Sequence, residues 1–193
     1  MKRLMAGAVL SAVLISGAAA QVAPPRFNPA APENRQVIPS FSFATVEPVL
    51  KQIGAQYRRG GDPARPTLMV TFTNNRRATI TMSGCDSTGA NCKALSVQSY
   101  WTRITNASAD QTGDAISAFN HKYAFAKAFV ASDGRPALQR YLTADFGFVR
   151  GNLAVNLLVF ANQADRYATE VLGPLEARRP AAPTPSPSPA GTP

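Results

Sequence analysis

Residues 67–101 decide the fold, and they read TLMVTFTNNRRATITMSGCDSTGANCKALSVQSYW. Apolar and polar residues alternate along three parts of this stretch, which is the period of a β-strand with one buried face. Two adjacent asparagines between the first two parts are typical of a tight turn and predict a hairpin. We therefore expect strands at about 67–73, 78–83 and 93–101, joined as an antiparallel three-strand meander.

Three helices and a fourth strand are expected around this meander. Apolar residues recur at steps of three and four in 46–53, with Thr45 as the N-cap, and again in 152–173, so each segment predicts an amphipathic helix. The segment 58–66 is rich in Gly and Pro and is interpreted as a loop. A fourth strand is expected at 138–144. The predicted order is α-β-β-β-α-β-α, an α+β fold in which the antiparallel sheet packs against helices.

The middle helix, expected at 114–130, carries two apolar stripes. Phe125 and Phe129 form the second stripe, about a third of a turn around the helix from the first. A helix with two apolar faces packs against two neighbours, so Phe125, Phe129 and the nearby Asn120 are the candidate partner-binding residues. A single wide core-facing surface is the alternative. The first stripe consists of Ile116, Phe119, Tyr123, Ala126 and Val130.

The two ends of the chain differ in composition from the middle. Residues 1–20 combine two basic residues, an uncharged apolar run and three alanines, which predicts a signal peptide cleaved before Gln21. An uncleaved anchor is the alternative, although the run is short for a membrane span. Proline-rich composition predicts a flexible segment at 21–40 and a disordered tail at 179–193, which leaves 41–178 as one folded domain. We expect a periplasmic or secreted protein with no membrane span after cleavage.

The chain is basic, with 20 Lys and Arg against 11 Asp and Glu. The basic residues are scattered and no basic run exceeds two, so nucleic acid is not an expected partner. Arg58, Arg59, Arg76 and Arg77 flank the first strand of the meander and could gather at one sheet edge. An anion- or glycan-binding protein of the cell envelope is therefore an alternative function.

Cys85 and Cys92 are the only cysteines, and three interpretations compete for them. Structural zinc needs four ligands, and with one histidine in the chain neither a metal nor another cofactor is expected. Redox centres favour a C-x-x-C spacing, whereas six residues separate this pair. A disulfide across a turn fits best, because the intervening DSTGAN is turn chemistry and an exported protein meets oxidising conditions. The redox interpretation stays open as the weaker alternative.

A family resemblance emerges from the same residues. Gly84 and Cys85, a short polar loop, Cys92 and an alternating strand that ends in an aromatic residue resemble the YbjN-domain family, whose members are labelled bacterial sensory transduction regulators. The family also has an aliphatic residue, an aromatic–Asn pair and a Phe-Ala-x-Ala-aromatic run. Those positions are matched by Ile116, Phe119–Asn120, Phe125–Ala126 and Ala128–Phe129.

The resemblance covers about 46–172 and implies a fold similar to type III secretion chaperones, which are commonly dimeric and hold other proteins. It therefore implies a non-enzymatic role, an unidentified protein partner and a possible homodimer. The chain departs from the family pattern at Ala124, at Tyr141 and in the stretch DFGF at 145–148. If that surface contacts a partner, these departures favour a different partner.

A hydrolase is the remaining alternative. Any histidine-dependent mechanism must use His121, the only histidine, which the pattern places on the middle helix. Asp133 and Asp145 are candidate acids, but nothing in the sequence brings them together. The sequence favours a surface role for His121.

Overall fold

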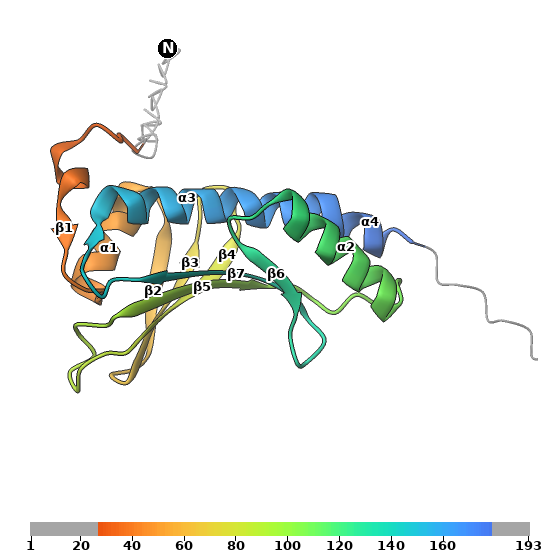
Figure 1. The fold of residues 1–193 in the computed structure, drawn as a ribbon, viewed down its shortest axis with the longest axis horizontal. Helices are drawn as coiled ribbons and strands as arrows, with labels where there is room; N and C mark the ends of the chain where they lie inside the picture. Colours follow the sequence, from red (N-terminus) through yellow and green to blue (C-terminus); the bar gives the residue numbers. More distant parts are fainter. Residues whose placement is uncertain (1–26, 179–193) are drawn as a thin grey trace, which may run out of the picture.

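The computed structural model describes residues 27–178, which form a six-stranded antiparallel sheet with its helices on one side (Figure 1). The strand order is β2-β3-β4-β5-β7-β6, and a separate two-stranded sheet pairs β1 with β8. The architecture confirms the predicted α+β class. The strands are β1 (Val37–Ile38), β2 (Gln56–Asp62), β3 (Arg65–Thr71), β4 (Arg77–Ser83), β5 (Ala94–Tyr100), β6 (Lys127–Val130), β7 (Pro136–Thr143) and β8 (Phe148–Val149). The helices are η1 (Pro32–Arg35), α1 (Phe43–Gln52), α2 (Ala109–Lys122), α3 (Arg150–Tyr167), η2 (Ala168–Leu172) and α4 (Gly173–Glu176).

Strands β3, β4 and β5 form the expected meander. Thr71 faces Arg77 across the first hairpin, and Ile80 faces Leu68 on one side and Val97 on the other. Leu68, Ile80 and Val97 are buried beneath the helices, and each contributes about 1.5–3 kcal/mol by leaving water. A shift of one residue would move all three to the opposite face, so the alternation sets the register.

The predicted loop at 58–66 is wrong, because β2 and the start of β3 occupy it as a hairpin. Gly61 adopts a φ of 75°, and the backbone N–H of Arg65 donates to Asp62 Oδ1 at 2.9 Å, which closes the turn. β2 is an edge strand whose residues are all exposed or half-buried. It therefore lacks the apolar alternation that reveals a strand, and its extended form comes from pairing with β3.

The middle helix is shorter than predicted. α2 ends at Lys122, and residues 127–130, expected on the same helix, form strand β6. The buried Ala126 and Ala128 follow a strand period of two, which is hard to separate from a helical period over so few residues. The helix with two apolar faces does not exist, because Phe125 and Phe129 lie beyond its end.

The first helix starts earlier than expected and has a different cap. α1 begins at Phe43, and Ser42 rather than Thr45 is the N-cap. The Ser42 hydroxyl accepts from the Thr45 N–H at 3.3 Å, while the Thr45 hydroxyl accepts from the Ser42 N–H at 2.8 Å. Thr45 thus holds the third position of a reciprocal capping box.

The last helix carries its predicted apolar stripe against the sheet but does not stop at Gly173. The chain widens into the π-helical segment η2 and continues as α4, with the Gly173 N–H bonded to the Ala168 carbonyl five residues back. Pro174 cannot donate, and its ring would crowd the turn before it, so the wider turn accommodates it. The stripe consists of Leu153, Leu157, Phe160, Ala164 and Val171, all of them buried.

Residues 27–40 differ from the flexible segment expected there. The Gln36 carbonyl accepts from the Arg150 N–H at 2.9 Å, and the Asn34 side chain accepts from the Gln52 side chain at 3.0 Å. At Gly151 a Cβ would lie 2.8 Å from the Asn34 carbonyl oxygen, so this close approach to α3 needs glycine. The predicted signal peptide and tail lie outside the described residues.

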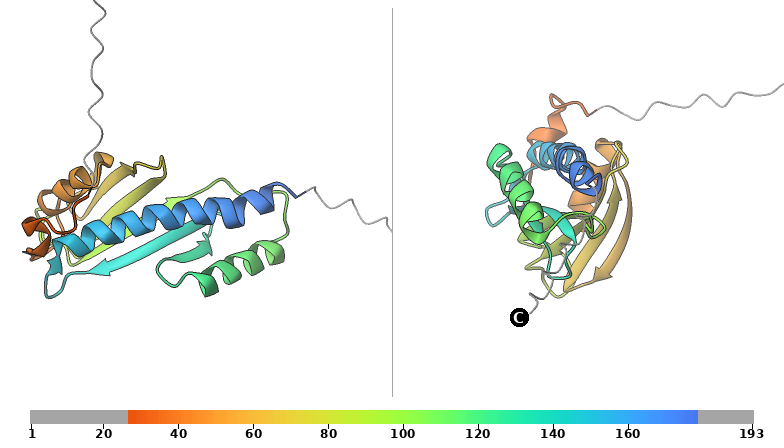
Figure 2. Two further views of the ribbon diagram at one scale, coloured as in Figure 1. Left: turned by 90° about the horizontal axis from the view of Figure 1, so that it is seen from above. Right: turned by 90° about the vertical axis from the view of Figure 1, so that its right-hand side faces the viewer.

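The second face of the main sheet, which we call the outer face, is covered by no helix of residues 27–178 (Figure 2). In the two views of Figure 2, α1, α3 and α4 lie along the inner side of the curved sheet, and α2 lies beside its β6 end. Within residues 27–178, no helix has the length and hydropathy needed to cross a bilayer.

Candidate functional site

The outer face is built from the polar half of each alternating strand. One residue of each strand contributes to a row across all six, and the side chains in this row are charged, polar or, in one case, a methionine. Apart from Met69, these side chains are hydroxyl, amide and basic rather than apolar, so most of the face can stay in contact with water. The row is Arg58, Met69, Thr79, Gln98, Gln139 and Lys127.

A hollow of about 600 Å³ lies on the outer face across β2, β3, β4 and β5. Gln56, Thr79 and Gln98 supply amide and hydroxyl groups that can both donate and accept hydrogen bonds. Met69 and Tyr100 line it as well, with 40% and 41% of their surfaces exposed. The described lining includes three arginines and no Asp, Glu or His, so the arrangement is suited to binding an anion.

The four arginines of the predicted anion site do not gather at one edge. Arg59 turns to the helix side, where its Nη2 lies 2.9 Å from Glu47 Oε2 of α1. Arg76 likewise reaches α3, with Nη2 at 2.7 Å from an oxygen of Asp165.

The other two arginines of that set, Arg58 and Arg77, line the hollow on the outer face. Among the described residues, no carboxylate forms an ion pair with either of them, whereas Arg59 and Arg76 each have one. The Arg58 guanidinium lies against Met69, with Nη2 3.3 Å from the sulfur. Of the four predicted arginines, Arg59 and Arg76 are therefore neutralised on the helix side, whereas Arg58 and Arg77 remain available to a ligand on the outer face.

The third arginine of the hollow comes from the turn between β6 and β7. The Arg135 guanidinium lies 4.8 Å from the centre of the Tyr100 ring, a cation–π contact. Its Nε also donates to Asp133 Oδ2 at 2.7 Å. Hydrogen bonds from the Arg135 backbone and side chain lower the pKa of Asp133, so that carboxylate stays charged and holds the arginine in place. Tyr100, Gln98 and Arg135 carry no functional signal in the sequence. Gln98 and Tyr100 share one face of β5, and the placement of β7 beside β5 brings Arg135 to them.

Cys85 and Cys92 are joined by a disulfide. The pairing of Ser83 with Ala94 directs the two cysteines toward each other two residues beyond the end of the ladder. Cys92 also exchanges two backbone hydrogen bonds of 2.9 Å with Phe41, which ties the turn to the segment before α1. The disulfide is therefore a structural link between β4 and β5.

The six-residue turn inside the disulfide is organised by one carboxylate. Asp86 accepts from the Thr88 hydroxyl at 2.6 Å, from the Asn91 amide at 2.7 Å, and from the backbone N–H groups of Thr88 and Ala90. These hydrogen bonds lower the pKa of Asp86 to about 2, and the bond from the Thr88 side chain has the largest effect. All four of these hydrogen bonds stay within the turn, so Asp86 organises the turn's own backbone and side chains.

Asn120, a candidate partner-binding residue, binds the chain's own backbone. Its amide nitrogen donates to the Ala128 carbonyl at 2.8 Å, and its amide oxygen accepts from the Ala128 N–H at 2.8 Å. Because β6 is an edge strand, these groups would otherwise lack a ladder partner. The side chain thus takes the place of a neighbouring strand and fastens α2 to the sheet.

Phe125 and Phe129 do not form a common surface. Phe125 packs against the core, and the Arg140 guanidinium lies 4.2 Å from its ring centre. Phe129 is half-buried on β6 and faces Ala137, which in turn faces Tyr100 on β5. Phe129 therefore belongs to the outer face, while the half-buried Phe125 packs against the core.

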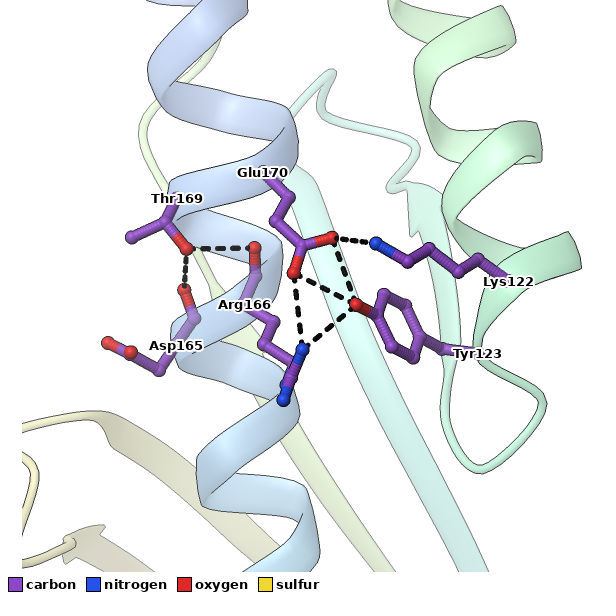
Figure 3. Close-up of polar contacts among 6 residues, drawn as sticks. All are labelled: Lys122, Tyr123, Asp165, Arg166, Thr169 and Glu170. Carbon is purple, nitrogen blue, oxygen red and sulfur yellow. Dashed lines mark hydrogen bonds and ion pairs between the residues drawn. The ribbon is translucent and has the colours of Figure 1, made fainter.

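A second polar cluster joins α2 to the π-helical segment (Figure 3). Glu170 accepts from Lys122 Nζ at 2.8 Å and from the Tyr123 hydroxyl at 2.9 Å, and Arg166 Nη1 donates to the same hydroxyl at 3.1 Å. The hydrogen bonds from Lys122 and then from Tyr123 lower the pKa of Glu170. Thr169 bonds back to the Asp165 carbonyl at 3.0 Å on the opposite side of the helix. The contacts are internal to the domain, and they dock α2 onto the end of α3.

The residues proposed for hydrolysis stay apart. His121 lies exposed in the last turn of α2, Asp133 is bound to Arg135, and Asp145 lies in the loop before β8. Within the described part of the chain, no group of three or more His, Cys, Asp or Glu side chains could hold a metal ion.

Comparison with known proteins agrees with the resemblance. The family model described as "YbjN: Putative bacterial sensory transduction regulator" matches residues 42–173, which span the fold from the α1 cap to the first residue of α4. A search of curated proteins found no match. The matched segment covers more than half of the chain and contains the sheet, the disulfide turn and the three main helices. The chain therefore belongs to the YbjN family.

Proposed function

We propose that this protein is a non-enzymatic, exported regulator-type domain that binds another protein through the outer face of its sheet. The observation that carries the proposal is this open face, where Met69, Tyr100 and Tyr141 are each at least 40% exposed among polar side chains and arginines. Exposed Met, Tyr and Arg are the residue types enriched in protein interfaces.

The size of the outer face supports an interface. Six strands spaced about 4.8 Å apart and about seven residues long cover roughly 550 Å² in projection. The accessible area of a side-chain-covered face is larger than its projection, and a standard interface uses about 800 Å² from each partner. The face thus has the dimensions of one ordinary protein contact.

Export is part of the proposal, and two observations support it. Residues 1–20 have the composition of a signal peptide, and the disulfide between Cys85 and Cys92 is compatible with an oxidising compartment. The measurement is mass spectrometry of the protein from a periplasmic fraction. A chain that starts at Gln21 supports export, and an intact chain found only inside the cell contradicts it.

A photo-cross-linking amino acid tests the binding face directly. Ser96 and its neighbour Thr81 lie in the middle of the outer face, whereas Val155 is 44% exposed on α3. With the cross-linker at Ser96, we expect one reproducible adduct with another protein; the same group at Val155 is the control. Adducts that are equal from both positions, or absent from Ser96, would refute the assignment of the face. An adduct with a second copy of this chain would identify the homodimer implied by the fold resemblance.

A further inference from the structure

We propose that the hollow on the outer face binds an extended acidic segment of the partner protein, with Arg58 and Arg77 as its two anchoring residues. The inference rests on the proposed function, and it adds the chemistry of the partner. Three features of the described residues support it: the sign of the charge, the freedom of two arginines, and the spacing between them.

The charge of the hollow is of one sign. Arg58, Arg77 and Arg135 line it, and no carboxylate is among the described lining residues. Arg135 is partly neutralised by Asp133, with their side chains 2.7 Å apart, so it contributes less attraction than the other two. Two guanidinium groups without an ion-pair partner favour a ligand that supplies carboxylates, because arginine binds carboxylate oxygens through two N–H groups at once.

The contrast with the neighbouring arginines shows that the open pair is not a general property of the basic surface. Arg59 is next to Arg58 in sequence, and Arg76 is next to Arg77, yet each of the two has a carboxylate within 2.9 Å on the helix side. Alternation along β2 sends Arg58 and Arg59 to opposite faces, and Arg76 lies in the turn just before β4, where it turns toward α3. The outer-face pair keeps its charge available to a ligand.

The spacing of the two anchors suits an extended peptide. Arg58 pairs with Met69 on β3, and Arg77 pairs with Thr71, two residues further along β3. The two arginines are thus two strands and two residues apart, or about 12 Å between their Cα atoms. In an extended peptide, side chains four residues apart point the same way at about 13 Å. Acidic residues at such spacing can each meet one arginine, and the peptide between them would cross Met69 and Thr71 of β3, where the Thr71 hydroxyl can bond to it.

The test uses purified full-length protein and a fluorescein-labelled peptide, Glu-Thr-Glu-Thr-Glu-Thr-Glu, followed by fluorescence anisotropy. The matched probe has Gln at every Glu. We expect binding of the Glu peptide that weakens as salt rises, because the contacts are exposed to solvent. The R58Q/R77Q variant should bind about tenfold more weakly, which corresponds to two exposed charge contacts.

The R59Q/R76Q variant is the matched control, because it removes the same two charges from adjacent positions that face the helices. We expect its affinity for the Glu peptide to change by less than about threefold. Equal weakening by both double variants would show that only net charge matters and would overturn the proposal. So would equal binding of the Gln peptide, or binding of an oligogalacturonate in place of the peptide, which would identify an acidic glycan as the ligand.

The cross-linker at Ser96 separates this inference from the proposed function. Placed in the R58Q/R77Q background, it should capture much less of the partner than it does in the wild-type background. Undiminished capture would leave the outer face as the binding surface and refute the acidic segment. No capture in either background would refute the binding face itself.

Discussion

Replacing Asn120 by alanine tests whether this side chain is a clamp inside the domain or a contact for a partner. The wild-type amide makes two hydrogen bonds of 2.8 Å, one to the N–H and one to the C=O of Ala128. Ala128 is only 2% exposed, so water cannot easily replace the lost amide. The Asn120→Ala variant therefore leaves one donor and one acceptor without a partner at the edge of the sheet.

The expected loss of stability follows from those two groups. An unpartnered buried backbone group costs about 1–3 kcal/mol, so the pair should lower the free energy of unfolding by about 3 kcal/mol. For a domain of this size, that corresponds to a fall in Tm of about 6–12 °C. Chemical denaturation measures the free energy, and hydrogen exchange at the Ala128 amide reports the local opening of β6 from α2.

The adjacent His121→Ala is the matched control, since His121 is exposed on the same helical turn. We expect it to change stability by no more than about 0.5 kcal/mol. If Asn120→Ala is as stable as His121→Ala, the clamp does not hold the sheet edge and the reasoning is refuted. In that case, a loss of cross-linked partner in Asn120→Ala would restore the hypothesis of a partner contact.

Three further predictions concern single groups. The buried Tyr167 hydroxyl has no hydrogen-bond partner among the described residues, and burial raises its pKa, so Tyr167→Phe should match or exceed the wild-type Tm, whereas Tyr167→Ala should lower the free energy of unfolding by about 3–5 kcal/mol. A Tyr167→Phe variant that is destabilised by more than about 1 kcal/mol would reveal a partner for the hydroxyl. Because the pKa of Asp86 is lowered, its contribution to stability is complete above the unfolded pKa near 3.8 and is lost as pH falls toward about 2. The NMR chemical shift of the Thr88 amide should therefore titrate in that range in the wild type and stay constant in Asp86→Asn. Reduction of the disulfide between Cys85 and Cys92 should lower the free energy of unfolding by about 2–3 kcal/mol, and a mass showing two free thiols in the native protein would contradict the link.

Where a single strand carries its own alternation, the sequence predicts the structure well. The residues of β3, β4 and β5 show which face is buried, and the turn residues show how the strands are joined. These features depend on interactions between near neighbours, which the order of residues describes directly.

Other elements depend on contacts that are distant in sequence. β2 has no fully buried residue and is a strand because β3 pairs with it, and β6 is held in place by β7 and by Asn120. Arg135 reaches Tyr100 only because β7 lies beside β5. None of these contacts has a periodic signal, so the pattern of residues in 58–66 and 125–130 favoured the wrong elements.

By itself, the sequence determined the α+β class, the meander, the turn between Cys85 and Cys92, and the family to which the chain belongs. Only the tertiary structure decided which arginines remain available. Glu47 of α1 and Asp165 of α3 neutralise Arg59 and Arg76, while Arg58 and Arg77 stay open on the outer face. The physical reason is that alternation assigns each residue to a face, but the charge it meets there comes from helices folded back from distant parts of the chain.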